Sequence, residues 1–482
     1  MDGNFSHFGE LYTLLASTQP KTHFLHSREE DGWHTVSKKD FLQTVRHLAL
    51  AFEKEGYGGR QVSIAIEPSP QWLMLDYALM LSGAVTVPLF TNISEKNLAF
   101  ELKDADIQTV FVSDEEAAAL MVRLKSDIDI RYVHHPSHPS HGFESMVYEG
   151  REVDRSDPER FSSLLEKIDA DDLATIVYTS GTSGLPKGVE LTHRNLISQI
   201  HATAQNYHFD KEKDVAFSLL PLAHIFERMV MHFYLSQELE VYFADDVKRV
   251  GERLKEVNPT VMTVVPRLLE KVFFKMKRKA LEGSLPKQLI VRAAFWRAST
   301  KDPSTAPNLF DKLLERVVYS KLRTALGSRM RMMISGGAAL SDMLYRFYLN
   351  IGIGLYQGYG QTESSPVICA NTPEANKIGT CGRAFPGVEV KLSKEGELLA
   401  RGDNVMRGYH NNPEATAEAI DAEGWLHTGD LAKIDEEGYI TITGRKKELF
   451  KTSTGEYVSS VHIEQKLLER GWFEHAMLIG YG

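Results

Sequence analysis

The chain has 482 residues and a mass of 54.3 kDa, more than one hydrophobic core usually supports, so we expect two or more domains. Its 55 Lys and Arg against 65 Asp and Glu give a net charge of −10, which argues against nucleic acid as a partner. Only Cys369 and Cys381 occur, in no Cys-x-x-Cys pair, which argues against a disulfide framework and favours the cytoplasm. The N-terminus shows no signal peptide.

The first long apolar stretch runs from Trp72 to Phe90 and has the length of a membrane span, but Asp76, Ser82, Gly83 and Pro88 interrupt it. We predict instead a strand over 62–66, a helix over 70–81 and a strand over 84–89. A helix over 94–103 and a strand over 107–112 continue the alternation. This pattern predicts an α/β fold of mostly parallel sheets with helices on both faces.

His134 to His141 (H-H-P-S-H-P-S-H) contains four histidines. Metal binding is one interpretation, but prolines restrict the geometry and no carboxylate is interleaved, so a solvated connector is favoured.

The segment from Tyr178 to His193 (Y-T-S-G-T-S-G-L-P-K-G-V-E-L-T-H) contains the densest chemical pattern of the chain. It follows a predicted buried strand over 173–178, includes a second strand over 189–191, and precedes a helix that Thr192 can cap. Glycines let backbone N–H groups turn toward an anion, while hydroxyls and a lysine add donors and charge. The segment therefore predicts a polyphosphate cradle. It is not a Walker A loop, because Lys187 lies between Pro186 and Gly188.

This segment resembles the phosphate-binding element of adenylate-forming enzymes, the superfamily of acyl-CoA synthetases, luciferases and peptide-synthetase adenylation domains. The resemblance implies an ATP-phosphate loop with Thr182 and Lys187 as catalytic residues. Its nucleotide-binding residues would be Thr179, Ser180, Gly181, Ser183 and Gly184.

A second motif, Gly358 to Glu363 (G-Y-G-Q-T-E), follows the predicted strand and glycine pair of residues 332–339. An aromatic face can stack on a base, a threonine hydroxyl can donate to a phosphate, and a carboxylate is a natural Mg²⁺ ligand. The motif matches the Y-G-x-T-E element of the same superfamily. The resemblance implies Tyr359 against adenine, Thr362 on the α-phosphate and Glu363 on Mg²⁺. The other residues around the nucleotide would be Gly336, Gly337, Ala338, Gly358 and Gly360.

Two later motifs match the superfamily in order, W-L-H-T-G-D over 425–430 and G-R-K-K over 444–447. A carboxylate can accept two hydrogen bonds from a ribose diol, and the resemblance implies this role for Asp430. Arg445 would also reach the ribose, and Lys447 would be the hinge. We therefore expect a large adenylation domain over 1–444, with mostly parallel helix-covered sheets and a β-rich subdomain. A small α+β domain would begin in 445–482.

The superfamily's small domain normally extends further and supplies a late lysine, whereas only 35 residues follow Lys447 here. We expect residues 450–482 to pack loosely, and the chain to be a shortened version of a longer enzyme with slow adenylation.

The runs L-P-L-A-H-I-F-E-R (220–228) and V-P-R-L-L-E-K-V (265–272) resemble long-chain fatty-acyl-CoA synthetases. In that group His224 would lie at the wall between nucleotide and acyl pocket. The resemblance implies ATP- and Mg²⁺-dependent conversion of a fatty acid to acyl-AMP, then transfer to CoA. A fatty-acyl-AMP ligase that serves a carrier protein and a catalytically impaired nucleotide-binding protein are the alternatives. A dinucleotide site is disfavoured, because residues 352–358 spell G-x-G-x-x-x-G rather than the Rossmann fingerprint.

Residues 271–297 contain eight basic residues against one acidic residue, Glu282. The helix around Lys271–Lys279 is either a peripheral membrane contact or an ordinary helix with solvated lysines. The sequence leaves homodimer formation open.

Overall fold

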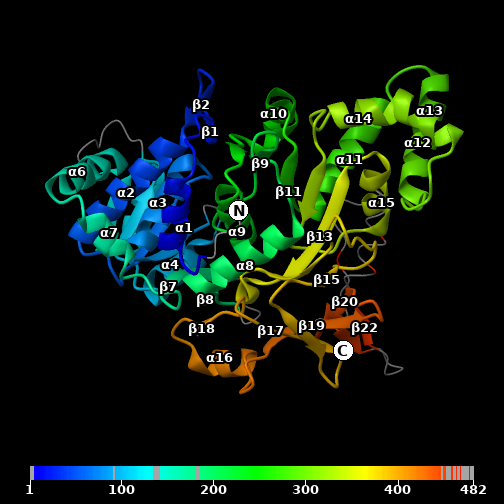
Figure 1. Ribbon diagram of the computed structural model, residues 1–482. Coiled ribbons are helices and arrows are strands. Elements are labelled where there is room, and N and C mark those ends of the chain that lie inside the picture. The colour runs from blue at the N-terminus through cyan, green and yellow to red at the C-terminus, as the bar shows by residue number, and fades with distance from the viewer. Residues whose placement is uncertain are drawn as a thin grey trace. The chain divides into compact units, whose positions relative to one another are not determined.

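Segments from different parts of the chain associate into two units in the computed structural model (Figure 1). It describes residues 5–90, 93–133, 142–179, 184–446, 449–451, 457–459, 463, 467 and 477. Unit 1 comprises Met1–Val247, Thr362–Pro366 and Asp403–Glu418. Unit 2 comprises Lys248–Gln361, Val367–Gly402 and Ala419–Gly482. The boundary between residues 444 and 445 stays a prediction, and the loose packing of residues 450–482 concerns a segment that lies mostly outside the described residues.

A seven-stranded sheet, in the order β18-β8-β7-β4-β3-β5-β6, is the centre of unit 1. The pairs among β7, β4, β3, β5 and β6 are parallel, whereas β8 runs antiparallel to both β7 and β18. Strands β4 and β5 are buried along their whole length, as expected for a sheet with both faces covered. The strand bounds are β3 Gln61–Ala65, β4 Val85–Pro88, β5 Thr109–Val112, β6 Asp129–Tyr132, β7 Leu173–Thr179, β8 Lys187–Thr192 and β18 Gly408–Tyr409.

The helices of unit 1 begin where local capping signals place them. Ser69, Ser94 and Thr192 each accept a hydrogen bond from a backbone N–H in the first turn of α3, α4 and α8, which satisfies a donor that the helix leaves unpaired. The bounds are α1 Phe8–Ser17, α2 Lys38–Lys54, α3 Pro70–Leu81, α4 Glu95–Asp104, α5 Glu115–Leu124, α6 Phe143–Ser156, α7 Arg160–Leu165, α8 His193–Asn206, α9 Ile225–Ser236, α16 Pro413–Ala419 and the 3₁₀ turn η3 Thr362–Ser364. Helix α2 packs against α3 and α6.

The apolar stretch from Trp72 to Phe90 is a helix followed by a strand, as predicted. Helix α3 spans Pro70–Leu81 and β4 spans Val85–Pro88. In the described part of the chain, no helix has the length and apolar character needed to cross a membrane.

Asp76, the charge that interrupts this stretch, pairs with Arg228 of α9 in the interior of unit 1, and both are fully buried. The guanidinium donates to the Asp76 carboxylate from Nε at 2.8 Å and from Nη2 at 2.5 Å, and to Thr175 Oγ1 of β7 at 2.7 Å. The Thr175 hydroxyl donates in turn to the Thr86 carbonyl of β4. Burial alone would raise the pKa of Asp76, but Arg228 and His232 outweigh it and lower that pKa.

Four further strands of unit 1 follow in the order β9-β10-β1-β2. The pairs β9/β10 and β10/β1 are parallel, and β1/β2 is an antiparallel hairpin. Their bounds are β1 Leu25–Arg28, β2 Trp33–Val36, β9 Val215–Ser218 and β10 Glu240–Phe243.

Unit 2 contains the strands β11, β12 and β13, which pair in parallel, and β14 and β15, which add antiparallel. A four-stranded antiparallel sheet β16-β17-β19-β20 and the hairpin β21-β22 complete its described strands. The strand bounds are β11 Val261–Val264, β12 Met332–Ser335, β13 Gly354–Gly360, β14 Val367–Ala370, β15 Arg383–Ala384, β16 Glu389–Leu392, β17 Glu397–Arg401, β19 Leu426–Ile434, β20 Ile440–Arg445, β21 Leu449–Lys451 and β22 Tyr457–Ser459.

The helices of unit 2 are mostly contributed by residues 248–350. Their bounds are α10 Val250–Val257, α11 Pro266–Ala280, α12 Leu285–Thr300, α13 Leu309–Leu314, the π-helix η2 Glu315–Tyr319, α14 Ser320–Thr324 and α15 Asp342–Asn350; the 3₁₀ turn η1 Val247–Arg249 precedes α10.

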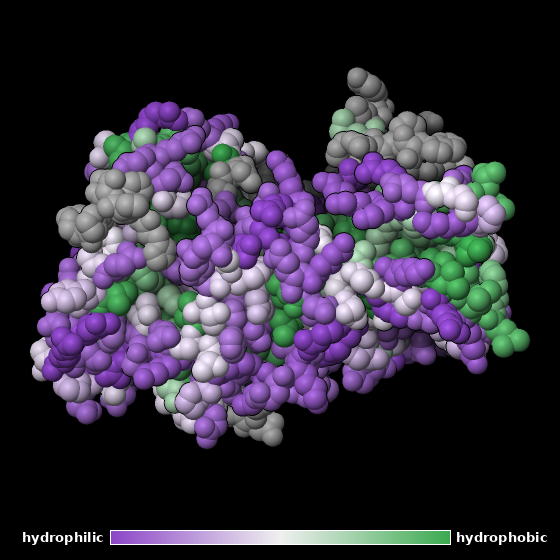
Figure 2. Space-filling model, turned by 90° about the horizontal axis from the view of Figure 1, so that it is seen from above, coloured by the Kyte–Doolittle hydropathy of each residue, from purple (hydrophilic) through white to green (hydrophobic). Residues whose placement is uncertain are grey.

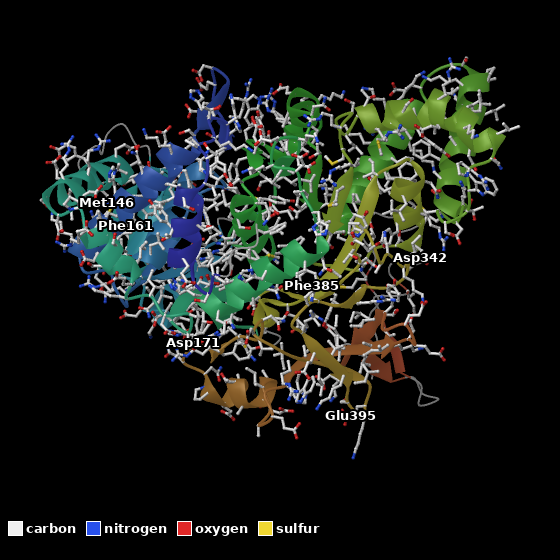
Figure 3. All side chains as sticks on the ribbon, in the orientation of Figure 1. Met146, Phe161, Asp171, Asp342, Phe385 and Glu395 are labelled. Atoms are coloured by element: carbon white, nitrogen blue, oxygen red, sulfur yellow. The ribbon has the colours of Figure 1, made fainter. Side chains whose placement is uncertain are left out.

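The Asp76→Ala variant should lower the free energy of unfolding by about 3–5 kcal/mol, because it leaves the Arg228 charge buried without its counter-ion. Urea unfolding measures this loss. The matched control is Asp171→Ala, at an exposed residue (Figure 3) that pairs with Arg194, and it should cost about 0–1 kcal/mol. Equal losses in the two variants would contradict the role given to Asp76.

His193 gives unit 1 a pH-dependent stability. Burial lowers its pKa to about 3, and its Nδ1 accepts a hydrogen bond from the Phe8 N–H at 3.4 Å. The unfolded chain protonates this imidazole near pH 6.5, so its contribution is complete above pH 6.5 and falls as pH decreases. Between pH 6.5 and 5, the wild-type chain should lose about 2 kcal/mol more stability than His193→Gln. Parallel stability curves for the two proteins would refute this.

Candidate functional site

The predicted phosphate loop connects two antiparallel strands of unit 1. Thr179 ends β7 and pairs with Lys187, the first residue of β8, so the register of the two strands fixes both ends of the loop. Gly184 has φ +90°, a backbone conformation that a side chain would strain. The predicted loop residues Ser180, Gly181, Thr182 and Ser183 lie outside the described residues, as does Lys447.

Gly188 lets β18 approach β8 closely. A Cβ atom at this position would lie 2.8 Å from Ile176 Cγ2 and 3.2 Å from His410 Cβ. Two contacts hold His410 against β8. Its backbone N–H donates to the Gly188 carbonyl, and its ring nitrogen Nδ1 lies 2.8 Å from Glu190 Oε1. Residues 408–410 are thereby fixed against the strand that begins with Lys187.

Lys187, Tyr409 and Glu363 form one cluster in unit 1, although they come from three distant parts of the sequence. The Lys187 ammonium lies 4.6 Å from the centroid of the Tyr409 ring, a cation–π contact. The Tyr409 hydroxyl donates to Glu363 Oε1 at 2.8 Å. Burial raises the pKa of Tyr409, and the neighbouring Glu363 charge raises it further, so the phenol stays protonated and remains a donor.

The backbone around this cluster is held by side-chain amides. Asn195 of α8 donates to the Asp403 and Val405 carbonyls at 2.7 and 2.9 Å, and Asn404 donates to the Ser364 carbonyl. The Met406 N–H donates to the Glu363 carbonyl at 2.9 Å. Thr362 and Glu363 are half-buried in η3. The backbone of Glu363 is therefore held in place, while its side chain is partly accessible to solvent.

His224 is the N-cap residue of α9. Its Nδ1 accepts a hydrogen bond from the Phe226 N–H at 3.3 Å, and its ring meets Phe90 edge-on at 6.5 Å between centroids. The residue is exposed, which is compatible with contact to a small molecule. It has a structural role as well, because it satisfies one of the first donors of the helix.

Asp430 is the centre of a second cluster, in unit 2. Tyr359 donates its hydroxyl to Asp430 Oδ2 at 2.6 Å, Gln361 donates to the same oxygen at 3.0 Å, and Arg445 donates to Oδ1 at 3.2 Å. Burial raises the pKa of Tyr359 first, and the Asp430 charge raises it further. Both oxygens of the Asp430 carboxylate therefore accept hydrogen bonds that fix its orientation.

The remaining predicted residues of unit 2 are glycines and an alanine at strand ends. Gly336 is buried directly after β12, whereas Gly337 and Ala338 are exposed. Gly337 has φ +79°, so only glycine adopts this turn without strain. Gly358 and Gly360 flank Tyr359 in β13, where the register against β14 shifts between Tyr359 and Gly360.

The structure adds Tyr409 and Gln361 to the candidate site. Gln361 occupies the variable position of the G-Y-G-Q-T-E motif, so the motif does not mark it. Tyr409 belongs to no quoted motif, and only the pairing of β18 with β8 brings it to Lys187. Asp430 and Glu363 thus share one feature, a tyrosine hydroxyl donated to a carboxylate.

Known proteins resemble this chain over most of its length. The family model for AMP-binding enzymes matches residues 15–410. The long-chain-fatty-acid–CoA ligase FadD15 of Mycobacterium bovis is 32% identical over 467 residues, 95% of this chain and 77% of that protein. The human long-chain-fatty-acid–CoA ligase 1 is 32% identical over 470 residues, covering 91% of this chain and 67% of its own.

Among solved structures, the o-succinylbenzoate coenzyme A synthetase of Bacillus subtilis in complex with ATP and magnesium ion superposes with a TM-score of 0.71. The match covers 98% of this chain and 86% of that one at 20% identity, which shows a shared fold. The predicted α/β adenylate-forming fold and the superfamily resemblance are both confirmed. This chain belongs to the AMP-binding enzyme family.

Proposed function

We propose that this chain is an AMP-forming long-chain fatty acid–CoA ligase. Family membership supports acid activation with ATP, and the names of relatives 32% identical over more than nine-tenths of the chain support a long-chain fatty acid and CoA. The observation that carries the proposal is the Lys187–Tyr409–Glu363 cluster, in which a carboxylate is fixed by a tyrosine that also contacts a lysine of the phosphate loop.

In the first step, a fatty-acid carboxylate oxygen attacks the α-phosphorus of ATP, the bond to the β-phosphate breaks, and pyrophosphate leaves. The two reactants carry charge of the same sign, so the residues must supply positive charge and donors. We assign this to Lys187, to the Thr179–Gly184 loop and to Thr362. Asp430 and Arg445 would hold the ribose, and Tyr359 would meet the adenine.

Glu363 fits a magnesium site, because a carboxylate offers about four acceptor positions and Tyr409 uses one of them. When bound, Mg²⁺ would withdraw negative charge from the phosphates. In the second step, the CoA thiolate attacks the acyl carbonyl carbon and AMP leaves, so no covalent protein nucleophile is needed. His224 would line the boundary between the nucleotide and the acyl chain, and Lys447 would be the hinge.

Release of AMP with saturated acids of increasing chain length, with and without CoA, tests this function. We expect release to depend on CoA and to be fastest with long-chain acids. Formation of acyl-AMP with CoA-independent turnover would instead indicate an acyl-AMP ligase that serves another acceptor. ATP binding with no acid-dependent pyrophosphate exchange would overturn the enzymatic assignment.

Tyr409→Phe should lower turnover about 10- to 100-fold, because a hydrogen bond to a charged group is worth about 1.5–3 kcal/mol. The Tyr409 ring, and with it the contact to Lys187, remains in this variant.

Glu363→Gln should lower turnover at least about 100-fold, since a neutral amide removes the charge itself. The control is Tyr148→Phe, at an exposed tyrosine of α6. Initial-rate kinetics with varied Mg²⁺ measure all three, and normal activity of Tyr409→Phe would exclude its positioning role.

We also propose that unit 2 contacts an anionic lipid surface. Helix α11 buries Leu269, Phe273 and Met276, whereas Lys271, Lys275, Arg278 and Lys279 are exposed. The neighbouring helices α12 and α13 expose large apolar side chains, including Leu285, Leu289, Trp296, Leu309 and Leu313, each with 56–85% of its surface in solvent. Hydrophobic residues gather at the right-hand end of Figure 2, where Figure 1 places these two helices. Apolar side chains beside lysines suit the interface of an acidic membrane.

Sedimentation with vesicles that contain anionic lipid tests this contact. Binding should weaken with salt and be lost when Lys275, Lys277 and Lys279 are changed to Glu, because about 1 kcal/mol is expected per basic residue near such a surface. Charge reversal of Lys96 and Lys394, exposed lysines elsewhere, should change little. If vesicle binding is the same at high salt and in the variant with the three α11 lysines changed to Glu, α11 is an ordinary helix whose lysines are solvated.

A further inference from the structure

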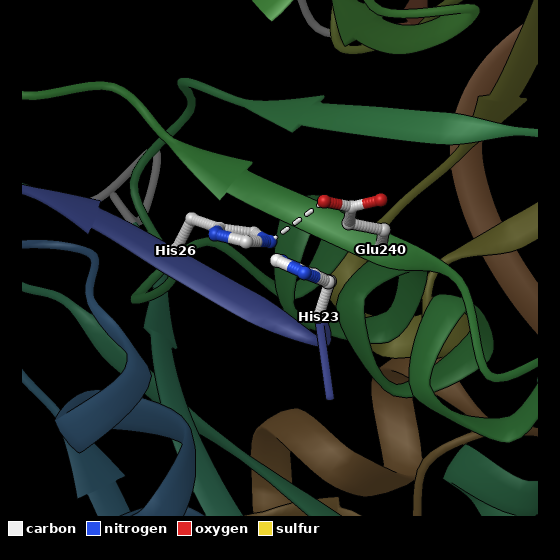
Figure 4. Close-up of side chains that lie close together, drawn as sticks. All are labelled: His23, His26 and Glu240. Carbon is white, nitrogen blue, oxygen red and sulfur yellow. Dashed lines mark ion pairs between the residues drawn. The ribbon is translucent and has the colours of Figure 1, made fainter. Parts of the chain in front are cut away.

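His23, His26 and Glu240 converge at the sheet formed by β1, β2 and β10 in unit 1 (Figure 4). One ligand atom from each lies within 4.8 Å of the others. His26 is on β1 and is 2% exposed, His23 precedes that strand and is exposed, and Glu240 begins β10 and is half-buried. None of the three belongs to the motifs that define the nucleotide site.

The buried half of this cluster places a histidine nitrogen against a carboxylate oxygen. Nε2 of His26 is 2.8 Å from Glu240 Oε1, close enough for an ion pair, although the angle of the contact is poor for a hydrogen bond. On the other side of the ring, Nδ1 lies 2.9 Å from the Thr35 hydroxyl of β2. When Thr35 donates to Nδ1, Nε2–H faces the Glu240 carboxylate directly. When Nδ1 donates to Thr35, Nε2 turns a lone pair toward the carboxylate, and a cation between the two atoms can bind both.

The surroundings hold both ligands in place. The Tyr242 ring stacks on His26 with 4.0 Å between centroids and 6° between planes, and the Tyr242 hydroxyl donates to Glu240 Oε1 at 2.9 Å. Tyr242 also pairs with His26 in the parallel register of β1 and β10. Hydrogen bonds of this kind, from an imidazole N–H to a neighbouring oxygen such as Thr35 Oγ1 and from Tyr242 to a carboxylate, orient ligands in known metal sites.

We propose that His23, His26 and Glu240 bind a divalent transition-metal ion, with Zn²⁺ as the ion that the set suits best. Two imidazoles and one carboxylate form the common three-ligand zinc set that leaves a position for water. Hard cations such as Mg²⁺ prefer oxygen ligands throughout, so the set does not duplicate the Glu363 site. His26 and Glu240 are already close together, and the exposed His23 completes the site by a side-chain movement.

Bound metal would join the start of the chain to its middle. His23 and His26 belong to the first strand region, and Glu240 lies more than 200 residues later on the parallel neighbour β10. Because ligand binding to the folded state alone stabilises it, Zn²⁺ should raise the thermal midpoint by at least about 2 °C at saturation.

A second group in the same hairpin, Glu29, Asp31 and His34, offers a matched control. Its members are all exposed, and His34 Nε2 already contacts Asp31 Oδ1 at 2.6 Å. The four histidines of the 134–141 tract could also bind zinc, so the experiment uses the full chain with these four changed to Asn.

Zinc affinity and stoichiometry are measured by competition with a chromophoric chelator, and Co²⁺ absorption reports the coordination. We expect one site per chain in this background. His23→Ala, His26→Asn and Glu240→Gln should each weaken it at least about 100-fold, since even outer-shell losses cost 10- to 100-fold. His34→Ala should keep the site and the thermal shift.

His23→Ala keeps the proposal testable if His26→Asn fails to fold, because His23 is exposed and its ring stacks on the outer side of the cluster against His26 rather than packing in the core. Tight zinc binding that survives His23→Ala and Glu240→Gln would overturn the proposal. Loss of binding in His34→Ala alone would assign the metal to the exposed group, and absence of any tight site would leave His26 and Glu240 as an ion pair between strands.

Discussion

The buried pair of Asp76 and Arg228 fixes the core of unit 1 from which β7 leads to the predicted phosphate loop. Removing two charges from water costs several kcal/mol per ion, so the pair persists only because its geometry is close to ideal. Arg228 bonds to both Asp76 oxygens and to Thr175 of β7, and the chain of hydrogen bonds continues to Thr86 of β4. The strand that ends at Thr179 is thereby tied to two helices and a neighbouring strand.

The candidate site also depends on two segments that are distant in sequence but belong to unit 1. Residues 362–366 and 403–418 leave the surrounding sequence of unit 2 and pack against β8 and α8. Gly188 favours this contact, because a Cβ atom there would lie only 3.2 Å from His410 Cβ, as well as 2.8 Å from Ile176 Cγ2 of β7. One short strand, β18, therefore brings Tyr409 to Lys187 and, through its hydroxyl, fixes Glu363.

Local signals in the sequence predicted the elements well. The helix over 70–81 has the predicted bounds, because a serine cap, Pro70 and the glycine after Ser82 specify both ends. The strand over 173–178 gains only Thr179. Long-range pairing carries no such local signal, so the partner of Asp76, the hairpin β1-β2 beside β10 and the role of Tyr409 appear only in the structure. Motif resemblance named Glu363 and Asp430, but it could not name the residues that orient them.

Those orienting residues follow one physical rule in both units. Tyr409 donates to Glu363 and Tyr359 donates to Asp430, and burial beside the carboxylate raises the pKa of each phenol. A lysine in the same place would neutralise the carboxylate and weaken its attraction for Mg²⁺. At Glu363 the neutral phenol fixes one oxygen without adding positive charge, whereas at Asp430 the phenol shares the carboxylate with Gln361 and Arg445. Tyrosine therefore suits a carboxylate that is proposed to attract a cation, as Glu363 is, because a phenol fixes the geometry and adds no positive charge.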